Sequence, residues 1–299
     1  MMPSERLLQM GVPMARALVF SAVAGICLCA APFTRPIGPD LAAAPAAEFH
    51  SDAPLPTAAE FDRLAQSDPI AAVEAAIRRY QSEVKGFRAS FHKRERIGGG
   101  LREQERIRVS FQSEPFSVLM KWEQGGGMAD ATLYVKGENA GQMQVKLARI
   151  GFVKSVDPRS ATPRASARYT IEEFGLVESM KRTHRAWSEA KAAGQLQVDY
   201  LGRKAVPELG GRECHVIKRT CPTDEIDAYA SGEPDEVTDK NRPDSFRTVT
   251  IYLDRENWYQ VGSVLHRADG ELVGSYFFRD LQLNPTFEKG SFSAATLKR

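Results

Sequence analysis

This sequence has few cysteines, no long apolar run and no excess of charge of one sign. Four of the 299 residues are cysteines, and two of these lie within the first thirty residues. The remaining pair, Cys214 and Cys221, is too small for a structural zinc site, which needs four ligands. The 40 lysines and arginines nearly balance the 38 acidic residues, so the composition predicts no overall affinity for nucleic acid or for membranes.

Local signatures of catalysis are also missing. The five histidines form no His-Glu-x-x-His pattern and adjoin no nucleophile elbow or phosphate loop: His50, His92, His184, His215 and His266. The aspartates between positions 224 and 239 lack the alternate spacing of an EF-hand loop. We therefore expect no catalytic residue, no metal site and no cofactor, and a hydrolase is the least favoured function.

The first 31 residues have the pattern of an export signal. Arg6 and Arg16 precede the uncharged run 17–31, and small residues with a proline follow it. The run has 15 residues, fewer than the roughly 20 that a membrane-spanning helix needs. We therefore predict a cleaved signal peptide and a periplasmic or cell-envelope location. Cleavage after Ala31 and cleavage after Ala46 both fit, and a lipid anchor at Cys27 is the alternative.

An exported chain permits disulfides, so Cys214 and Cys221 are a possible pair. Seven residues on an extended strand span over about 20 Å, whereas a disulfide tolerates a Cα separation of about 6 Å. A bridge therefore requires a bend in the chain. Two buried free thiols are the alternative.

The chain divides into three predicted parts: a signal peptide at 1–31, an Ala/Pro-rich linker at 32–66 and one folded domain at 67–299. In the domain, Ser67-Asp68-Pro69 is typical of a helix start and Gly86 of its end. Apolar residues recur there at spacings of three and four: Ile70, Val73, Ile77, Tyr80 and Val84.

A β-hairpin is predicted around Gly98-Gly99-Gly100. A turn centred on Gly99 gives these pairs: Ile97 with Leu101, Phe91 with Ile107, Ala89 with Val109, and Phe87 with Phe111. One face is then apolar except near the turn, where Lys93, Glu95, Glu103 and Glu105 fall. The other face contains basic residues and no acidic one: Arg88, His92, Arg94, Arg96, Arg102, Arg106 and Arg108.

Alternating segments follow, and a second amphipathic helix is predicted from a Thr170–Glu173 capping box to about Gly194. An acidic loop insert is predicted at 222–245, and three strands form a meander between 247 and 283. The pattern contains no βαβ alternation. We predict an α+β fold in which a curved, incompletely closed antiparallel barrel of about 9–11 strands has its concave face covered by the two amphipathic helices.

Several motifs resemble the exported proteins grouped as the domain of unknown function DUF1571. They are Phe91-His92-Lys93-Arg94-Glu95-Arg96-Ile97, Pro115-Phe116-Ser117-Val118, Leu133-Tyr134-Val135-Lys136-Gly137, Gly211-Arg212-Glu213-Cys214 and Ile251-Tyr252-Leu253-Asp254. The resemblance covers roughly residues 70–295, and the acidic insert departs from it. In overall design the family is similar to the periplasmic lipoprotein carriers, whose half-open barrel with a helical lid holds acyl chains.

This resemblance and the apolar concave face favour an exported, non-enzymatic binding protein for a lipid or a lipidated ligand. The residues predicted to line its cavity are Phe91, Val118, Met120, Trp122, Phe174 and Met180. The alternatives are that these six form plain core, or that the domain is a peptide- or partner-binding module. Six arginines are predicted to dock on an anionic membrane surface or an acidic protein: Arg88, Arg94, Arg96, Arg102, Arg106 and Arg108. We expect a monomer with no nucleic-acid partner.

Overall fold

The computed structural model describes residue 49 and residues 53–225 and 244–298. The predicted signal peptide, with Cys27, both candidate cleavage sites and most of the predicted linker and acidic insert, lies outside these residues. The chain divides into two units, Met1–Ala47 and Glu48–Arg299, and every described residue belongs to the second.

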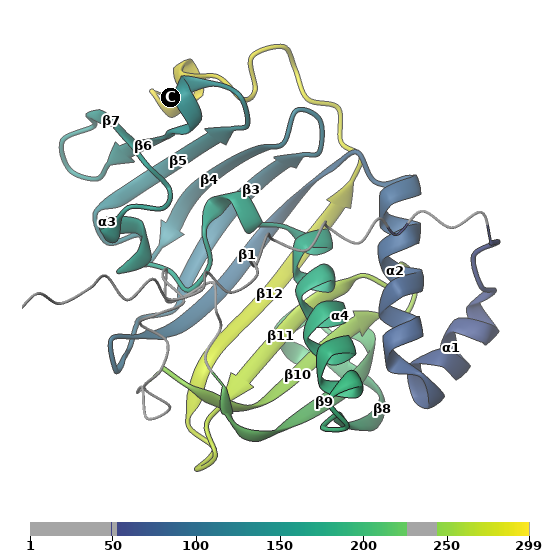
Figure 1. The fold of residues 1–299 in the computed structure, drawn as a ribbon. Helices are drawn as coiled ribbons and strands as arrows, with labels where there is room; N and C mark the ends of the chain where they lie inside the picture. The colour runs from purple at the N-terminus through teal and green to yellow at the C-terminus, as the bar shows by residue number, and fades with distance from the viewer. Residues whose placement is uncertain (1–48, 50–52, 226–243, 299) are drawn as a thin grey trace, which may run out of the picture. The chain divides into compact units, whose positions relative to one another are not determined.

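A single antiparallel sheet dominates this unit (Figure 1). Its strands are β1 (Gly86–Ile97), β2 (Gly100–Leu101), β3 (Glu105–Gln112), β4 (Ser117–Gln124), β5 (Ala129–Val135), β6 (Met143–Leu147), β7 (Val153–Val156), β8 (Gln197–Val206), β9 (Arg212–Glu225), β10 (Phe246–Asp254), β11 (Gln260–His266) and β12 (Leu272–Leu283). The α-helices are α1 (Ala58–Ser67), α2 (Pro69–Glu83), α3 (Ala161–Arg164) and α4 (Leu176–Ala192). Short 3-10 turns are η1 (Asn139–Gly141), η2 (Ile171–Glu173), η3 (Pro207–Leu209) and η5 (Ala294–Leu297).

The strand order is β7-β6-β5-β4-β3-β1-β12-β11-β10-β9-β8, with β2 paired to β1. Strands β1 to β7 form one meander and β8 to β12 a second, and the two join where β1 pairs with β12, for example Phe91 with Phe278. The sheet does not close into a barrel, because β7 and β8 are its edges among the described strands. The predicted curved α+β half-barrel is therefore confirmed, with 12 strands in place of 9–11.

The hairpin register is confirmed over most of its length. Phe87 pairs with Phe111, Ala89 with Val109 and Phe91 with Ile107. Near the turn the prediction is wrong by one residue, since Ile97 pairs with Gly100 and not with Leu101. Gly98 and Gly99 have φ values of 60° and 82°, and a two-residue turn with positive φ at both positions matches the right-handed twist of the strands.

The structure confirms the start of the first predicted helix, corrects the start of the second, and adds a helix before both. Helix α1 lies, except for its last residue, inside the range 32–66 predicted as linker, and its Phe61 is 0% exposed, so the packed structure begins before residue 67. Helix α2 follows the prediction, with Asp68 accepting a hydrogen bond from the Ala71 amide. Helix α4 begins at Leu176, because Thr170 makes no side-chain cap and starts the 3-10 turn η2 instead.

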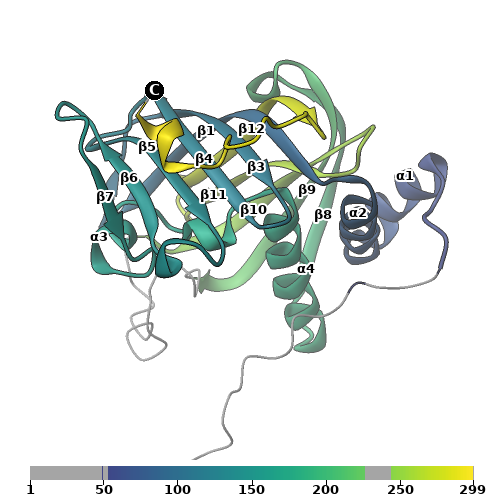
Figure 2. The same ribbon diagram turned by 90° about the horizontal axis from the view of Figure 1, so that it is seen from above.

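The main core lies between the helices and one face of the sheet. Figure 1 shows α4 in front of β11 and β12, with α2 beside it, and Figure 2 shows the sheet curving around α4. The largest fully buried core side chains include Trp187, Tyr259, Phe61, Phe87 and Phe111. The inner face of the curved sheet is therefore a packed layer covered by the helices, as the amphipathic stripes predict.

The opposite face of the sheet is covered only in part. The C-terminal segment places Leu297 and Phe292 over Leu119 and Leu133, and η3 places Leu209 near Phe277. Strand β9 continues to Glu225, so the first residues of the predicted insert at 222–245 are strand. Among the described residues no helix is long and apolar enough to cross a membrane.

Candidate functional site

A cleft of about 480 Å³, which we call the inner cleft, lies where the ends of the helices meet the β8–β9 edge of the sheet, and polar residues such as Gln66, Asp68 and Lys191 line part of it. Its apolar wall consists of Ala65, Ile70, Leu196, Val198, Tyr200 and Ile217. Two of these, Ala65 and Ile217, are fully buried members of the main core, and the others pack against that core. The cleft is therefore an extension of the inner apolar layer toward the surface.

Three local features of the sequence shape the cleft. The Asp68–Pro69 step ends α1 and starts α2, which turns the chain around one end of the cleft. Gly194 has a φ of 67° and reverses the chain after α4, as glycine does at helix ends. Because inner and outer residues alternate along β8, Val198 and Tyr200 both face inward.

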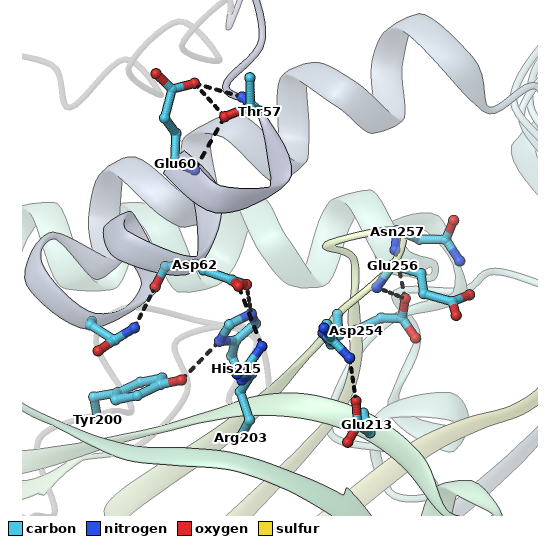
Figure 3. A network of polar contacts seen from close by, with 12 residues as sticks. Thr57, Glu60, Asp62, Tyr200, Arg203, Glu213, His215, Asp254, Glu256 and Asn257 are labelled. Atoms are coloured by element: carbon cyan, nitrogen blue, oxygen red, sulfur yellow. Dashed lines mark hydrogen bonds and ion pairs between the residues drawn. The ribbon is translucent and has the colours of Figure 1, made fainter.

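A polar network around the buried His215 side chain adjoins the cleft (Figure 3). The Tyr200 hydroxyl lies 2.9 Å from His215 Nδ1, and His215 Nε2 lies 3.0 Å from Asp62 Oδ1 of α1. The Asp62 carboxylate also accepts a hydrogen bond from Arg203 at 3.4 Å. His215 is 0% exposed, and Phe61 packs edge-on against its ring. This network joins α1 to the sheet beside the cleft.

The negative charge of Asp62 favours one arrangement of protons in this network. The His215 tautomer with its proton on Nε2 faces the carboxylate, although this contact lacks the alignment of a hydrogen bond, and Nδ1 then accepts from the Tyr200 hydroxyl. Burial lowers the pKa of His215, and the neighbouring Asp62 opposes this shift only in part. Burial likewise raises the pKa of Tyr200. The imidazole is therefore neutral, and the Tyr200 oxygen keeps free acceptor capacity on the cleft wall.

The lowered pKa of His215 predicts loss of stability in acid. Below its ordinary value of 6.5 the unfolded chain binds a proton that the folded site rejects, so the free energy of unfolding falls as the pH falls. One such group contributes a slope of at most about 1.4 kcal/mol per pH unit. Urea denaturation at pH 8 and pH 5 measures it.

His215→Gln is the test variant for this slope, with His266→Gln as the control. The pKa values of His92, His184 and His266 are also lowered by burial, so part of the slope persists in the test variant. We expect His215→Gln to reduce the slope more than His266→Gln, because the His215 ring is fully buried. Equal slopes in the two variants would contradict the assignment.

The six residues predicted to line a cavity gather in one cluster. Phe91, Val118, Met120 and Met180 belong to the main core, and Trp122 and Phe174 pack against it. The Phe91 and Phe174 rings meet edge-on with their centroids 5.3 Å apart. The cleft described above is lined by other residues. A role for these six in ligand binding stays a prediction.

The charged residues near the hairpin turn form a buried ionic cluster on the inner face. Lys93 Nζ lies 2.9 Å from Glu95 and 3.1 Å from Glu105. The Trp122 indole donates to Glu105 at 2.6 Å, and the Tyr276 hydroxyl donates to Glu95 at 2.8 Å. Burial alone lowers the pKa of Lys93, but the two carboxylates outweigh it and the pKa is raised. Every charge of this cluster has a partner.

The predicted docking arginines lie on the outer face, but the fold provides them with partners. Arg88 donates to the Thr286 carbonyl, Arg94 to the Arg102 carbonyl, Arg96 to Glu271, Arg102 to the Ala165 carbonyl, and Arg106 and Arg108 both to Glu123. The sequence of the hairpin has no acidic residue on this face, whereas strand β4 supplies Glu123 and the β11–β12 turn supplies Glu271. Docking through these six arginines stays a prediction.

Cys214 and Cys221 are both buried and free, which corrects the possible disulfide. Cys214 belongs to the outer-face cluster and Cys221 to the main core. The two lie an odd number of residues apart on one extended strand, so their side chains point to opposite faces of the sheet. Burial raises the pKa of each thiol to about 12.

A second cleft, of about 630 Å³, lies on the outer face of β8 to β11. Its lining combines charged residues, such as Lys204 and Lys218, with apolar ones, such as Leu201, Val206 and Val216. This cleft adjoins only a small apolar cluster that includes Tyr252 and Val206. Because the inner cleft continues into the main core of the domain, we take it as the candidate site for an apolar ligand.

Sequence reasoning missed the contribution of α1 to the inner cleft and to the polar network. The signal was present in Thr57-Ala-Ala-Glu60, since Thr57 and Glu60 form a capping box with reciprocal backbone hydrogen bonds (Figure 3). The packing of Asp62 against His215 joins residues distant in the chain, and no local pattern indicates it.

The fold and the cleft define an α+β half-barrel with an apolar opening beside its free edge. Residues 84–297 match the family described as "Protein of unknown function (DUF1571)". The chain belongs to this family, as the sequence motifs predict. No curated protein matches the chain.

Three solved structures are similar to this chain at low identity. The lipoprotein LppX of Mycobacterium tuberculosis has a TM-score of 0.40 and 14% identity, covering 74% of this chain and 99% of its own. A LolA superfamily protein from Nitrosomonas europaea has a TM-score of 0.33 and 9% identity, and the match covers 75% of this chain and 98% of that protein. A chain of the MucA/MucB complex of Pseudomonas aeruginosa has a TM-score of 0.37 and 13% identity, and the match covers 77% of this chain and 62% of that chain.

Proposed function

We propose that this protein is a non-enzymatic binding protein that holds an apolar ligand, such as the acyl chain of a lipid or lipidated molecule, in the inner cleft. The observation that carries this proposal is the apolar wall that extends the inner layer of the half-barrel to the surface at the β8–β9 edge. The predicted signal at 1–31 supports a location in the cell envelope.

The size and chemistry of the cleft suit such a ligand. A volume of about 480 Å³ lies within the range of small-molecule sites. Each methylene group buried there contributes about 0.8 kcal/mol. The Tyr200 oxygen accepts a hydrogen bond, and Lys191 at the rim offers a positive charge, so both suit the polar end of the ligand.

A longer ligand would have to enter the packed inner layer. Phe174 is only partly buried there and packs against Phe91. Movement of such side chains would bring the six predicted residues, Phe91, Val118, Met120, Trp122, Phe174 and Met180, into contact with the ligand. Their role is therefore proposed as an extension of the cleft.

Lipid extraction and mass spectrometry of the purified protein test the proposal, with Val198→Trp as the blocking variant. The indole would fill the cleft from β8, and we expect at least about tenfold less bound lipid than in the unchanged chain, because several methylene contacts are lost. Leu201→Trp is the matched control, since Leu201 lies on the same strand and is already 40% exposed.

Two results would contradict the proposal. One is an unchanged chain without bound lipid. The other is a folded Val198→Trp chain that carries as much lipid as the Leu201→Trp control. Circular dichroism and urea denaturation of both variants show whether they fold.

The free edge of β8 favours a second candidate, a peptide-binding module. Strand β8 has 10 residues and pairs only with β9 among the described strands. An extended peptide can add to such an edge through backbone hydrogen bonds. A partner bound by the unchanged chain and lost on Ala205→Pro, which would disrupt the edge, supports this candidate over the lipid.

A further inference from the structure

Large apolar side chains are exposed at one corner of the sheet. Among the described residues five large apolar side chains are exposed, and three of them belong to two turns: Met128 at 75%, Ile150 at 71% and Phe152 at 61%. Met128 lies in the β4–β5 turn, and the other two lie in the β6–β7 turn. We call these three residues the apolar tip.

The two turns are neighbours, so the three side chains form one surface. The Ala148 amide donates to the Met128 carbonyl at 2.9 Å, and the Leu147 amide donates to the Phe152 carbonyl at 2.8 Å. Strands β5 and β6 are paired up to these turns, with Ala129 opposite Leu147. Figure 1 shows the β6–β7 turn extending beyond the sheet at the left, beside β7.

The β6–β7 turn is built to present its side chains outward. Arg149 and Gly151 have φ values of 70° and 66°, and the amides of Ile150 and Gly151 donate back to Ala148 and Leu147. A non-glycine residue in the left-handed region is uncommon. Two large apolar residues at the end of an ordered turn expose apolar surface with no compensating packing, which is typical of an interaction site.

Basic residues surround the apolar tip. Arg149 and Lys154 are exposed, and within the described part of the chain neither has an ion-pair partner. The nearby acidic residue, Asp130, is paired with Lys146 at 3.0 Å. A second copy of the chain would bring Arg149 and Lys154 against their own counterparts, which is unfavourable. A partner for this surface must bury the apolar side chains and attract the two basic ones. An anionic surface with an apolar interior does both.

We propose that the apolar tip inserts into the headgroup–acyl boundary of an anionic lipid bilayer, with Arg149 and Lys154 contacting lipid phosphates. Apolar side chains gain from partial burial at this depth, and basic groups near the surface are attracted to anionic headgroups. The proposal does not depend on the inner cleft, because its residues lie at the other end of the strand order.

Tryptophan quenching locates the contact. Phe152→Trp is mixed with vesicles of phosphatidylcholine and phosphatidylglycerol that contain brominated acyl chains. We expect quenching beyond that of the unchanged chain, because the indole reaches the bromine atoms. Leu201→Trp is the control, since it places an exposed indole on β8, far along the strand order. No additional quenching in Phe152→Trp overturns the proposal.

Vesicle co-sedimentation measures the contribution of each group. The triple variant Met128→Ser/Ile150→Ser/Phe152→Ser is expected to bind the vesicles at least about tenfold more weakly. Arg149→Ala is expected to bind them about fivefold more weakly, and this difference is expected to disappear on vesicles of phosphatidylcholine alone. Leu201→Ser is the matched control. All variants share residues 1–48, so any membrane affinity of that segment is constant.

The alternative occupants give different results. A triple variant that binds vesicles as well as the Leu201→Ser control overturns the proposal. So does analytical ultracentrifugation in which the unchanged chain is a dimer and the triple variant a monomer, because that result would assign the tip to self-association. Because the three side chains are exposed, urea denaturation is expected to show unchanged stability.

Discussion

Replacing Lys93 with methionine is expected to lower the free energy of unfolding by about 3–5 kcal/mol. The substitution removes the cation between Glu95, which is 3% exposed, and Glu105, and it leaves both carboxylates without their ion pair in the core. Urea denaturation at neutral pH measures the effect. The raised pKa of Lys93 implies that its stabilisation is complete below the ordinary value of 10.5 and is lost as the pH rises through the folded value.

The control for Lys93→Met is Arg106→Ala on the outer face of the same hairpin. The Arg106 side chain is 46% exposed in its pair with Glu123, so its removal is expected to cost no more than about 1 kcal/mol. Adding Glu95→Gln to Lys93→Met is expected to restore part of the stability, because one unpaired charge is removed. Equal costs for Lys93→Met and Arg106→Ala would show that the ionic cluster is not buried as described.

Phe61→Ala is expected to cost about 3–5 kcal/mol of unfolding free energy, as large-to-small changes in a core do. The Phe61 ring is 0% exposed, stacks on Trp258 with centroids 4.5 Å apart and packs against His215. This result would show that α1 is part of the domain. Urea denaturation of the full chain measures it.

Arg63→Ala is the matched control within the same helix. Arg63 is exposed, so its substitution is expected to change the stability by no more than about 0.5 kcal/mol. If Phe61→Ala cost as little as Arg63→Ala, helix α1 would not pack on the sheet, and the predicted linker at 32–66 would stand uncorrected.

Much of the fold was predictable because it is recorded in local patterns. Alternation along β1 and β3 fixes the pairing of Phe87 with Phe111, since a slip of one residue would reverse every side chain. The turn itself was predicted wrongly, because three glycines in sequence allow several turn lengths. Helix α1 was missed because alanine and proline dominate the preceding segment and concealed the capping box at Thr57.

The candidate site was less predictable, because its parts come from distant segments. The sequence indicates an apolar inner face, but which part of that face stays unfilled depends on how the ends of α1, α2 and α4 meet β8. The outer arginines show the same difficulty. Their acidic partners Glu123 and Glu271 lie on other elements, so the charge of a single hairpin overstates the charge of the surface.

The pairing of β1 with β12 has a consequence for how the chain folds. Each meander forms through hairpins between neighbours in the sequence, whereas the junction joins Phe91 to Phe278 across almost the whole domain. Closing so long a loop costs entropy that only the completed junction recovers. We therefore expect the two meanders to form early and the junction to limit the folding rate, so that the nascent protein waits for its last strand before its apolar inner layer is covered.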